Sequence, residues 1–132
     1  MQYRTREGQI SAADTVTSLG GLYGVATATS VQVPANSSKI IGLMVSVATD
    51  GAANAASTFA VQLQGDGLTS GTETLTCGSI TNDGTNASDS NFCLPFQQAI
   101  DIPVIPSNQV SVAGIMAGDT GTVEMAVTLV FA

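Results

Sequence analysis

The sequence predicts an all-β domain, an eight-stranded antiparallel β-sandwich of the jelly-roll type. From residue 25 onward, apolar residues recur at every second position, which is the period of a strand with one buried face. Helical periodicity is scarce, and turn residues separate the apolar runs at spacings of roughly 8 to 15 residues. Because each such strand buries one face, two sheets packed face to face hide both apolar sets.

The first half of this body contains four predicted strands. Residues 25–33 alternate until Pro34, which cannot donate to a central ladder. Residues 41–48 are apolar on both sides, so this strand is predicted to be central, and Asp50-Gly51 ends it. Residues 59–64 form an amphipathic strand that stops at a Gly-Asp-Gly turn, and residues 74–77 form the next strand.

The second half supplies four more strands, over residues 92–96, 100–104, 110–114 and 122–131. Pro103 interrupts the second of these, which predicts a position at a sheet edge or beside a bulge. The final strand alternates without a break to the C-terminus. Eight strands suit a jelly roll. An immunoglobulin-like sandwich is the second choice, since the chain has no Trp.

Two parts are predicted, an irregular N-terminal arm over residues 1–24 and a β-sandwich domain over residues 25–132. The arm shows no strand alternation, and Gly20, Gly21 and Gly24 offer a hinge where it joins the body. The arm also holds two of the three basic residues. The residues expected to contact a neighbouring subunit are Tyr3, Arg4, Arg6 and Ile10.

Charge is unusually sparse in this chain. Only 10% of residues are charged, against roughly 25% in an average soluble domain. The surface is therefore expected to consist of small and polar residues. Such a surface favours a self-assembling subunit, although a secreted β domain also tolerates it. Ten acids against three bases give a net charge of −7. This balance argues against nucleic-acid binding, and membrane contact through the arm is expected to be weak at most.

No catalytic chemistry is expected. The chain has no His, so it lacks the usual general base and the commonest metal ligand. Acids such as Asp66, Glu73, Asp101 and Glu124 occur singly, where surface solvation explains them. No phosphate-binding, dinucleotide-binding or zinc-protease motif occurs. We therefore expect a protein that is not an enzyme, uses no cofactor or metal and has no small-molecule substrate.

The only thiols, Cys77 and Cys93, flank a polar loop over residues 78–91. A disulfide between them would close this loop if the flanking strands were adjacent, but Cys is also a small buried hydrophobe. The sequence leaves both alternatives open. Within the loop, Asp83, Asn86 and Asp89 offer oxygen ligands for a small ligand or Ca²⁺. Their spacing fits no EF-hand, so a plain polar loop is the preferred interpretation.

One family resemblance can be stated. A short arm, a body that begins near Val25, and a closing run Ile102–Val110 that leads into a terminal strand resemble the single jelly-roll structural proteins of icosahedral viruses. The resemblance covers residues 25–132 and is architectural. It implies a capsid or capsid-decorating subunit whose arm reaches between neighbours. Its partners would be copies of itself and other virion proteins, and it would be located in a virion assembled in the host cytoplasm.

Two other functions remain open from the sequence. One is a receptor- or glycan-binding tip on a spike or appendage, for which residues 78–91 would be the working part. The other is a subunit of an extracellular filament that donates its arm to the next copy. Either function would place the protein on an extracellular surface.

Overall fold

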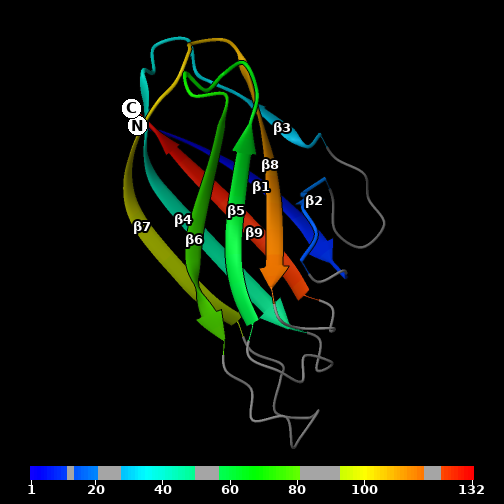
Figure 1. Cartoon of the computed structure of the whole chain (residues 1–132). Coiled ribbons are helices and arrows are strands. Elements are labelled where there is room, and N and C mark those ends of the chain that lie inside the picture. Colours follow the sequence, from blue (N-terminus) through cyan, green and yellow to red (C-terminus); the bar gives the residue numbers. More distant parts are fainter. Residues whose placement is uncertain (12–13, 21–27, 50–56, 81–92, 118–122) are drawn as a thin grey trace, which may run out of the picture.

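The computed structural model describes residues 1–11, 14–20, 28–49, 57–80, 93–117 and 123–132 (Figure 1). In these ranges the chain is all β, and none of its elements is a helix long and apolar enough to cross a membrane. The strands are β1 (Gln2–Ile10), β2 (Thr17–Ser18), β3 (Ser30–Gln32), β4 (Lys39–Thr49), β5 (Ser57–Gln64), β6 (Thr72–Ile80), β7 (Cys93–Pro103), β8 (Gln109–Ala117) and β9 (Val123–Phe131).

The strands form two antiparallel sheets. Sheet A has the order β1-β9-β4-β7, and sheet B has the order β2-β8-β5-β6, with β3 also paired to β8. Taken together, β2 and β3 act as one interrupted strand beside β8, which leaves eight strands. Apart from the β5–β6 pair, each step along the chain passes from one sheet to the other (Figure 1). This alternation produces a jelly roll and confirms the predicted fold class.

The core lies between the sheets and follows the alternation seen in the sequence. The inward side chains of β9 are at most 1% exposed, and so are those of β5, which oppose them from sheet B. Full burial of one such side chain contributes about 1.5–3 kcal/mol. These inward residues are Val123, Met125, Val127, Leu129 and Phe131 from β9, and Phe59, Val61 and Leu63 from β5.

Gly114 marks a place where the sheets approach closely. A Cβ at this position would lie 2.6 Å from both Ile10 Cδ1 and Met125 Sδ. A side chain on sheet B here would therefore require the ends of the Ile10 and Met125 side chains to shift, because they fill the space opposite.

The structure corrects the description of residues 1–24 as an irregular arm. Gln2–Ile10 is extended, but it is the edge strand β1 and pairs with β9 over its whole length. The sequence hides this strand because its half-buried face is polar, with Gln2, Arg4 and Arg6, and its apolar residue Ile10 comes only at the end. Residues 21–27, which contain most of the predicted hinge, lie outside the described residues.

A second difference concerns β7. Residues predicted as two strands form one strand from Cys93 to Pro103, which passes through Pro95. Proline is tolerated there because β7 pairs only with β4 and lies at the edge of sheet A. The predicted edge position of Pro103 is thereby confirmed.

Candidate functional site

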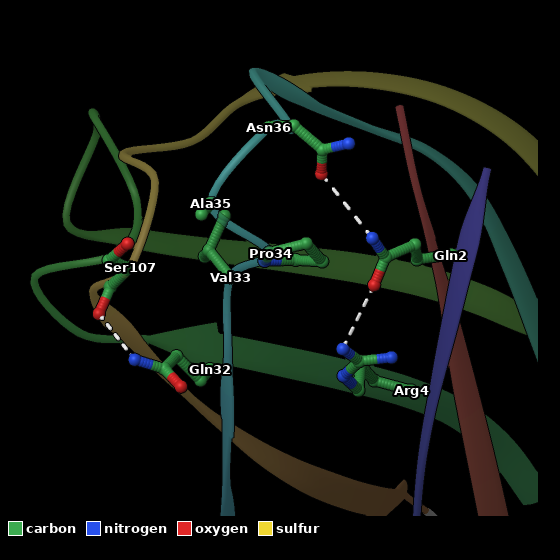
Figure 2. Close-up of a pocket in the computed structure, with 8 residues that line it drawn as sticks. All are labelled: Gln2, Arg4, Gln32, Val33, Pro34, Ala35, Asn36 and Ser107. Atoms are coloured by element: carbon green, nitrogen blue, oxygen red, sulfur yellow. Dashed lines mark hydrogen bonds between the residues drawn. The ribbon is translucent and has the colours of Figure 1, made fainter.

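A pocket opens where the edge of sheet A meets the edge of sheet B (Figure 2). Strand β1 forms one side, β3 and the turn after it form the other, and the turn before β8 adds one residue. The pocket has a volume of about 320 Å³ and is called the edge pocket here. Its lining residues are Gln2, Arg4, Gln32, Val33, Pro34, Ala35, Asn36 and Ser107.

Backbone hydrogen bonds between the two turns fix the wall opposite β1. The N–H of Val33 donates to the carbonyl of Asn108 at 2.9 Å, and the N–H of Ser107 donates to the carbonyl of Val33 at 3.0 Å. The Gln32 side chain donates to the Ser107 carbonyl at 3.1 Å. Ser107 has a φ of 67°, a left-handed conformation that costs a non-glycine residue on the order of 1–3 kcal/mol. Surrounding contacts therefore hold this turn in a strained shape.

On the β1 side, a side-chain relay orients the only cation in the pocket (Figure 2). Arg4 Nη2 donates to Gln2 Oε1 at 3.0 Å, and Gln2 Nε2 donates to Asn36 Oδ1 at 3.3 Å. Arg4 Nη1 also donates to the Tyr3 carbonyl at 3.0 Å. Because a guanidinium has donors only, the Gln2 oxygen must face Arg4 and the Gln2 NH2 group must face Asn36. The Asn36 oxygen, as the acceptor, then faces Gln2. The Nδ2 group of Asn36 is therefore not used by Gln2 and can donate elsewhere.

The electrostatics of this edge differ from those of the whole chain. None of the eight lining residues is acidic. Arg6 follows two positions along β1, on the same face as Arg4, and its Nε and Nη2 donate to the Ser30 carbonyl at 3.1 and 2.6 Å. Two of the three bases of an acidic protein thus lie on one strand edge. The site can bind an anion or hydroxyl groups, and its lining offers no base to activate a nucleophile.

The residues predicted to contact a neighbouring subunit have different environments. Tyr3 is 55% exposed on the outer side of sheet A. Arg4 lies in the edge pocket, and Arg6 is bonded to β3 of its own chain. Ile10 has no exposed surface and belongs to the core of its own domain. An inter-subunit role for Ile10 is therefore wrong, because burial within the domain already occupies its side chain.

Cys77 is a free thiol in this structure. It lies half-buried in β6 beside the core, and its Sγ donates to the Leu75 carbonyl at 3.6 Å. Burial raises the pKa of Cys77 to about 11, although a hydrogen bond with the backbone of Val61 acts in the opposite direction. Cys93 begins β7 in the other sheet, and its side chain is outside the described part of the chain. Of the two alternatives left open by the sequence, a disulfide or a small buried hydrophobic residue, the structure shows the second for Cys77.

The loop residues Asp83, Asn86 and Asp89 lie outside the described residues. Within the ranges that the structure does describe, no group of three or more His, Cys, Asp or Glu is arranged to hold a metal ion. The acids Asp66, Glu73, Asp101 and Glu124 each have an interaction of their own. Asp66 Oδ1 accepts from the Gln109 N–H at 3.1 Å, Glu73 Oε1 accepts from Ser70 Oγ at 2.8 Å, and Asp101 forms an ion pair with Lys39 at 3.1 Å.

The outer side of sheet B is a second surface that the sequence did not single out as a unit. The described outward side chains of β5, β6 and β8 include no Asp, Glu, Lys or Arg, and we call this surface the uncharged face. Exposed side chains of sheet A, by contrast, include Glu7, Lys39 and Asp101. The uncharged face consists of Thr58, Ala60, Gln62 and Gln64 from β5, Thr72, Thr74 and Thr76 from β6, and Gln109, Ser111, Ala113, Ile115 and Ala117 from β8.

Of the eight lining residues of the edge pocket, only Arg4 was predicted as a site residue, and the polar residues Gln2, Gln32, Asn36 and Ser107 were missed. Only one signal in the sequence points toward them. The alternation of Gln2, Arg4 and Arg6 is that of a strand with a polar inward face. The other wall comes from residues more than 25 positions away in the chain, so nothing local connects the two walls.

No family model and no curated protein sequence matches this chain. Several solved structures are similar to this chain at low identity. The acid-stable capsid structure of Helicobacter pylori bacteriophage KHP30 is 12% identical, with 98% of this chain and 87% of that chain covered and a TM-score of 0.41. The PRD1 vertex protein P5 is 9% identical, with 95% and 94% covered and a TM-score of 0.42. A family 22 carbohydrate-binding module from Clostridium thermocellum is 14% identical, with 97% and 84% covered and a TM-score of 0.46. At this level the likeness is one of fold alone.

Proposed function

We propose that this chain is a non-enzymatic structural subunit of a virus particle, a capsid or capsid-decorating protein that assembles with copies of itself. The observation that carries the proposal is the uncharged face of sheet B. Three adjacent strands present Thr, Gln, Ser, Ala and Ile side chains there, while the exposed ionic groups among the described residues lie on sheet A and in turns.

Desolvation favours such a surface at a contact between subunits. A contact between two proteins removes water from both surfaces, and an ionised group that loses its water destabilises the contact unless a partner compensates it. Hydroxyl and amide groups lose less free energy on desolvation, because they can form hydrogen bonds with one another across the contact. A surface without ions therefore suits repeated contact with identical copies, whereas a monomer in water benefits from interleaved charges.

The architecture supports the viral part of the proposal. Jelly rolls recur in viral capsid proteins, and the resemblance noted from the sequence points to the same group. The edge strand β1 pairs with β9 of its own chain over its whole length. The proposed assembly therefore relies on surfaces of the folded domain and not on a donated N-terminal segment.

The test is a set of single charge additions. Gln62→Glu and Thr74→Glu each place one negative charge on the uncharged face, and Ser11→Glu adds the same charge at an exposed position just after β1. Gln62 and Thr74 are direct cross-strand partners, so they are changed one at a time. Circular dichroism confirms the β fold of each variant.

Negative-stain microscopy and sedimentation velocity then give the assembly state. We expect large ordered particles from the concentrated wild type and from Ser11→Glu, and only small species from the two face variants. A wild type that stays monomeric at high concentration would contradict self-assembly. Face variants that assemble as the wild type does would exclude this face as the interface.

A further inference from the structure

We propose that the edge pocket binds an acidic sugar residue, a uronic or sialic acid, with its carboxylate on Arg4 and its hydroxyls on the surrounding amides. This inference goes beyond assembly and does not depend on it, because the edge pocket and the uncharged face have no residue in common. They come near each other only at the start of β8.

The charge of the pocket selects an anion. Arg4 is the cation among eight lining residues, and none of the others is acidic. Within the chain, Nη1 and Nη2 of Arg4 each donate one hydrogen bond. The other N–H groups of the five in the guanidinium are left to bind a ligand. A guanidinium fork matches the two oxygens of a carboxylate, and such charge-assisted bonds are stronger than neutral ones.

The amides distinguish a sugar acid from a simple carboxylate. Gln2, Gln32 and Asn36 outnumber the single cation, and each carries both donor and acceptor groups. A carboxylate can only accept hydrogen bonds, so it would need donors alone. Sugar hydroxyls both donate and accept. A lining of three amides beside one guanidinium therefore fits a ligand that carries several hydroxyls and one negative charge.

The size and walls also fit such a ligand. The volume of about 320 Å³ lies at the lower end of the range of roughly 300–1,000 Å³ for small-molecule sites. Pro34 and the exposed Ala35 supply an apolar wall between the two polar groups, and Val33, which has no exposed surface, packs behind them (Figure 2). The C–H face of a sugar ring can pack there, although none of the eight lining residues is aromatic.

The pocket is built before any ligand arrives. The hydrogen bonds from Arg4 to Gln2 and from Gln2 to Asn36 connect the β1 wall to the turn after β3, and the bonds of Ser107 to Val33 and Gln32 fix the opposite wall. Ser107 keeps a strained backbone to do so. Side chains that are already ordered lose little entropy on binding, which favours affinity in a small site.

The experiment is an NMR titration of the intact isotope-labelled chain. The probes are methyl glucuronide and methyl sialoside, each compared with methyl glucoside, which lacks the carboxylate. N-acetylglutamate serves as the carboxylate of a protein side chain. The variants are Arg4→Gln and Gln32→Ala. Lys39→Gln is the control, because it removes a cation outside the pocket. The exposed ion pair that Lys39 forms contributes little to stability. The spectrum of each variant also shows whether it is folded.

We expect at least one acidic glycoside to shift resonances of the lining residues with an affinity at least about tenfold above that of methyl glucoside, as a charge-assisted contact predicts. Arg4→Gln should lose this preference, Gln32→Ala should weaken binding of the acidic glycoside, and Lys39→Gln should bind as the wild type does. Equal binding of the glucuronide and the glucoside, no shift with either acidic glycoside, or N-acetylglutamate binding as tightly as the sugars would overturn the proposal. If Arg4→Gln is unfolded, an unchanged affinity in Gln32→Ala overturns it in the same way.

Discussion

Cys77 shows at the scale of one residue how burial sets chemistry. Its thiol lies half-buried against the core in β6, and loss of hydration raises its pKa to about 11. The thiolate is the nucleophile of cysteine chemistry, so a raised pKa makes the side chain inert near neutral pH. Cys77 is thus a packing residue, and the absence of His from the chain is consistent with that role.

Alkylation tests this assignment. In a Cys93→Ser background at pH 8, we expect iodoacetamide to modify Cys77 much more slowly in the native protein than in the denatured protein. The rate in the native protein should rise toward pH 11. Because the folded pKa lies above the unfolded value near 9.0, the stability that Cys77 contributes is complete below about pH 9 and is lost as the pH rises through about 11. Equal native and denatured rates at pH 8 would show that the thiol is not desolvated.

Strand β1 is the element that most changes the interpretation of the chain. A polar inward face gives it no apolar alternation, yet it closes one edge of sheet A and joins the two sheets through Arg6 and Ser30. At its end, Ile10 packs beside Gly114 in the core. The segment is therefore an integral strand of the domain.

Two alanine substitutions in β1 separate these roles. Ile10→Ala removes a fully buried side chain, and we expect a loss of about 2–5 kcal/mol in the free energy of unfolding. Tyr3→Ala changes an apolar residue of the same strand that is 55% exposed, and it should change stability by no more than about 0.5 kcal/mol. Urea unfolding followed by circular dichroism measures both. Similar small effects at the two positions would mean that β1 is a detachable arm after all.

The whole molecule distributes its few charges unevenly. Bases gather on β1, exposed acids and Lys39 lie on sheet A and in turns, and the described outer side of sheet B carries none. An acidic protein of this kind is repelled by its copies at long range. Contact through the uncharged face would stabilise an assembly against that repulsion.

Ionic strength provides a test at this scale. Salt screens the repulsion between subunits of charge −7 and has little effect on a contact without ions. We therefore expect the critical concentration for assembly, measured by light scattering, to stay constant or fall between about 50 and 500 mM NaCl, where the Debye length shortens several-fold. A critical concentration that rises steeply with salt would indicate an interface made of ion pairs.

The sequence by itself determined the all-β class, the two-sheet sandwich and most of the core, because the period of two in segments such as Val123–Phe131 is a local property of a strand with one buried face. It could not reveal β1, whose inward residues are polar, or the merging of two short strands into β7. Only the tertiary structure decided which surfaces exist. The edge pocket joins Arg4 to Asn36 and Ser107, and the uncharged face joins β5, β6 and β8. Such neighbours meet through strand order and sheet packing, which depend on the whole chain and leave no local pattern at the residues concerned.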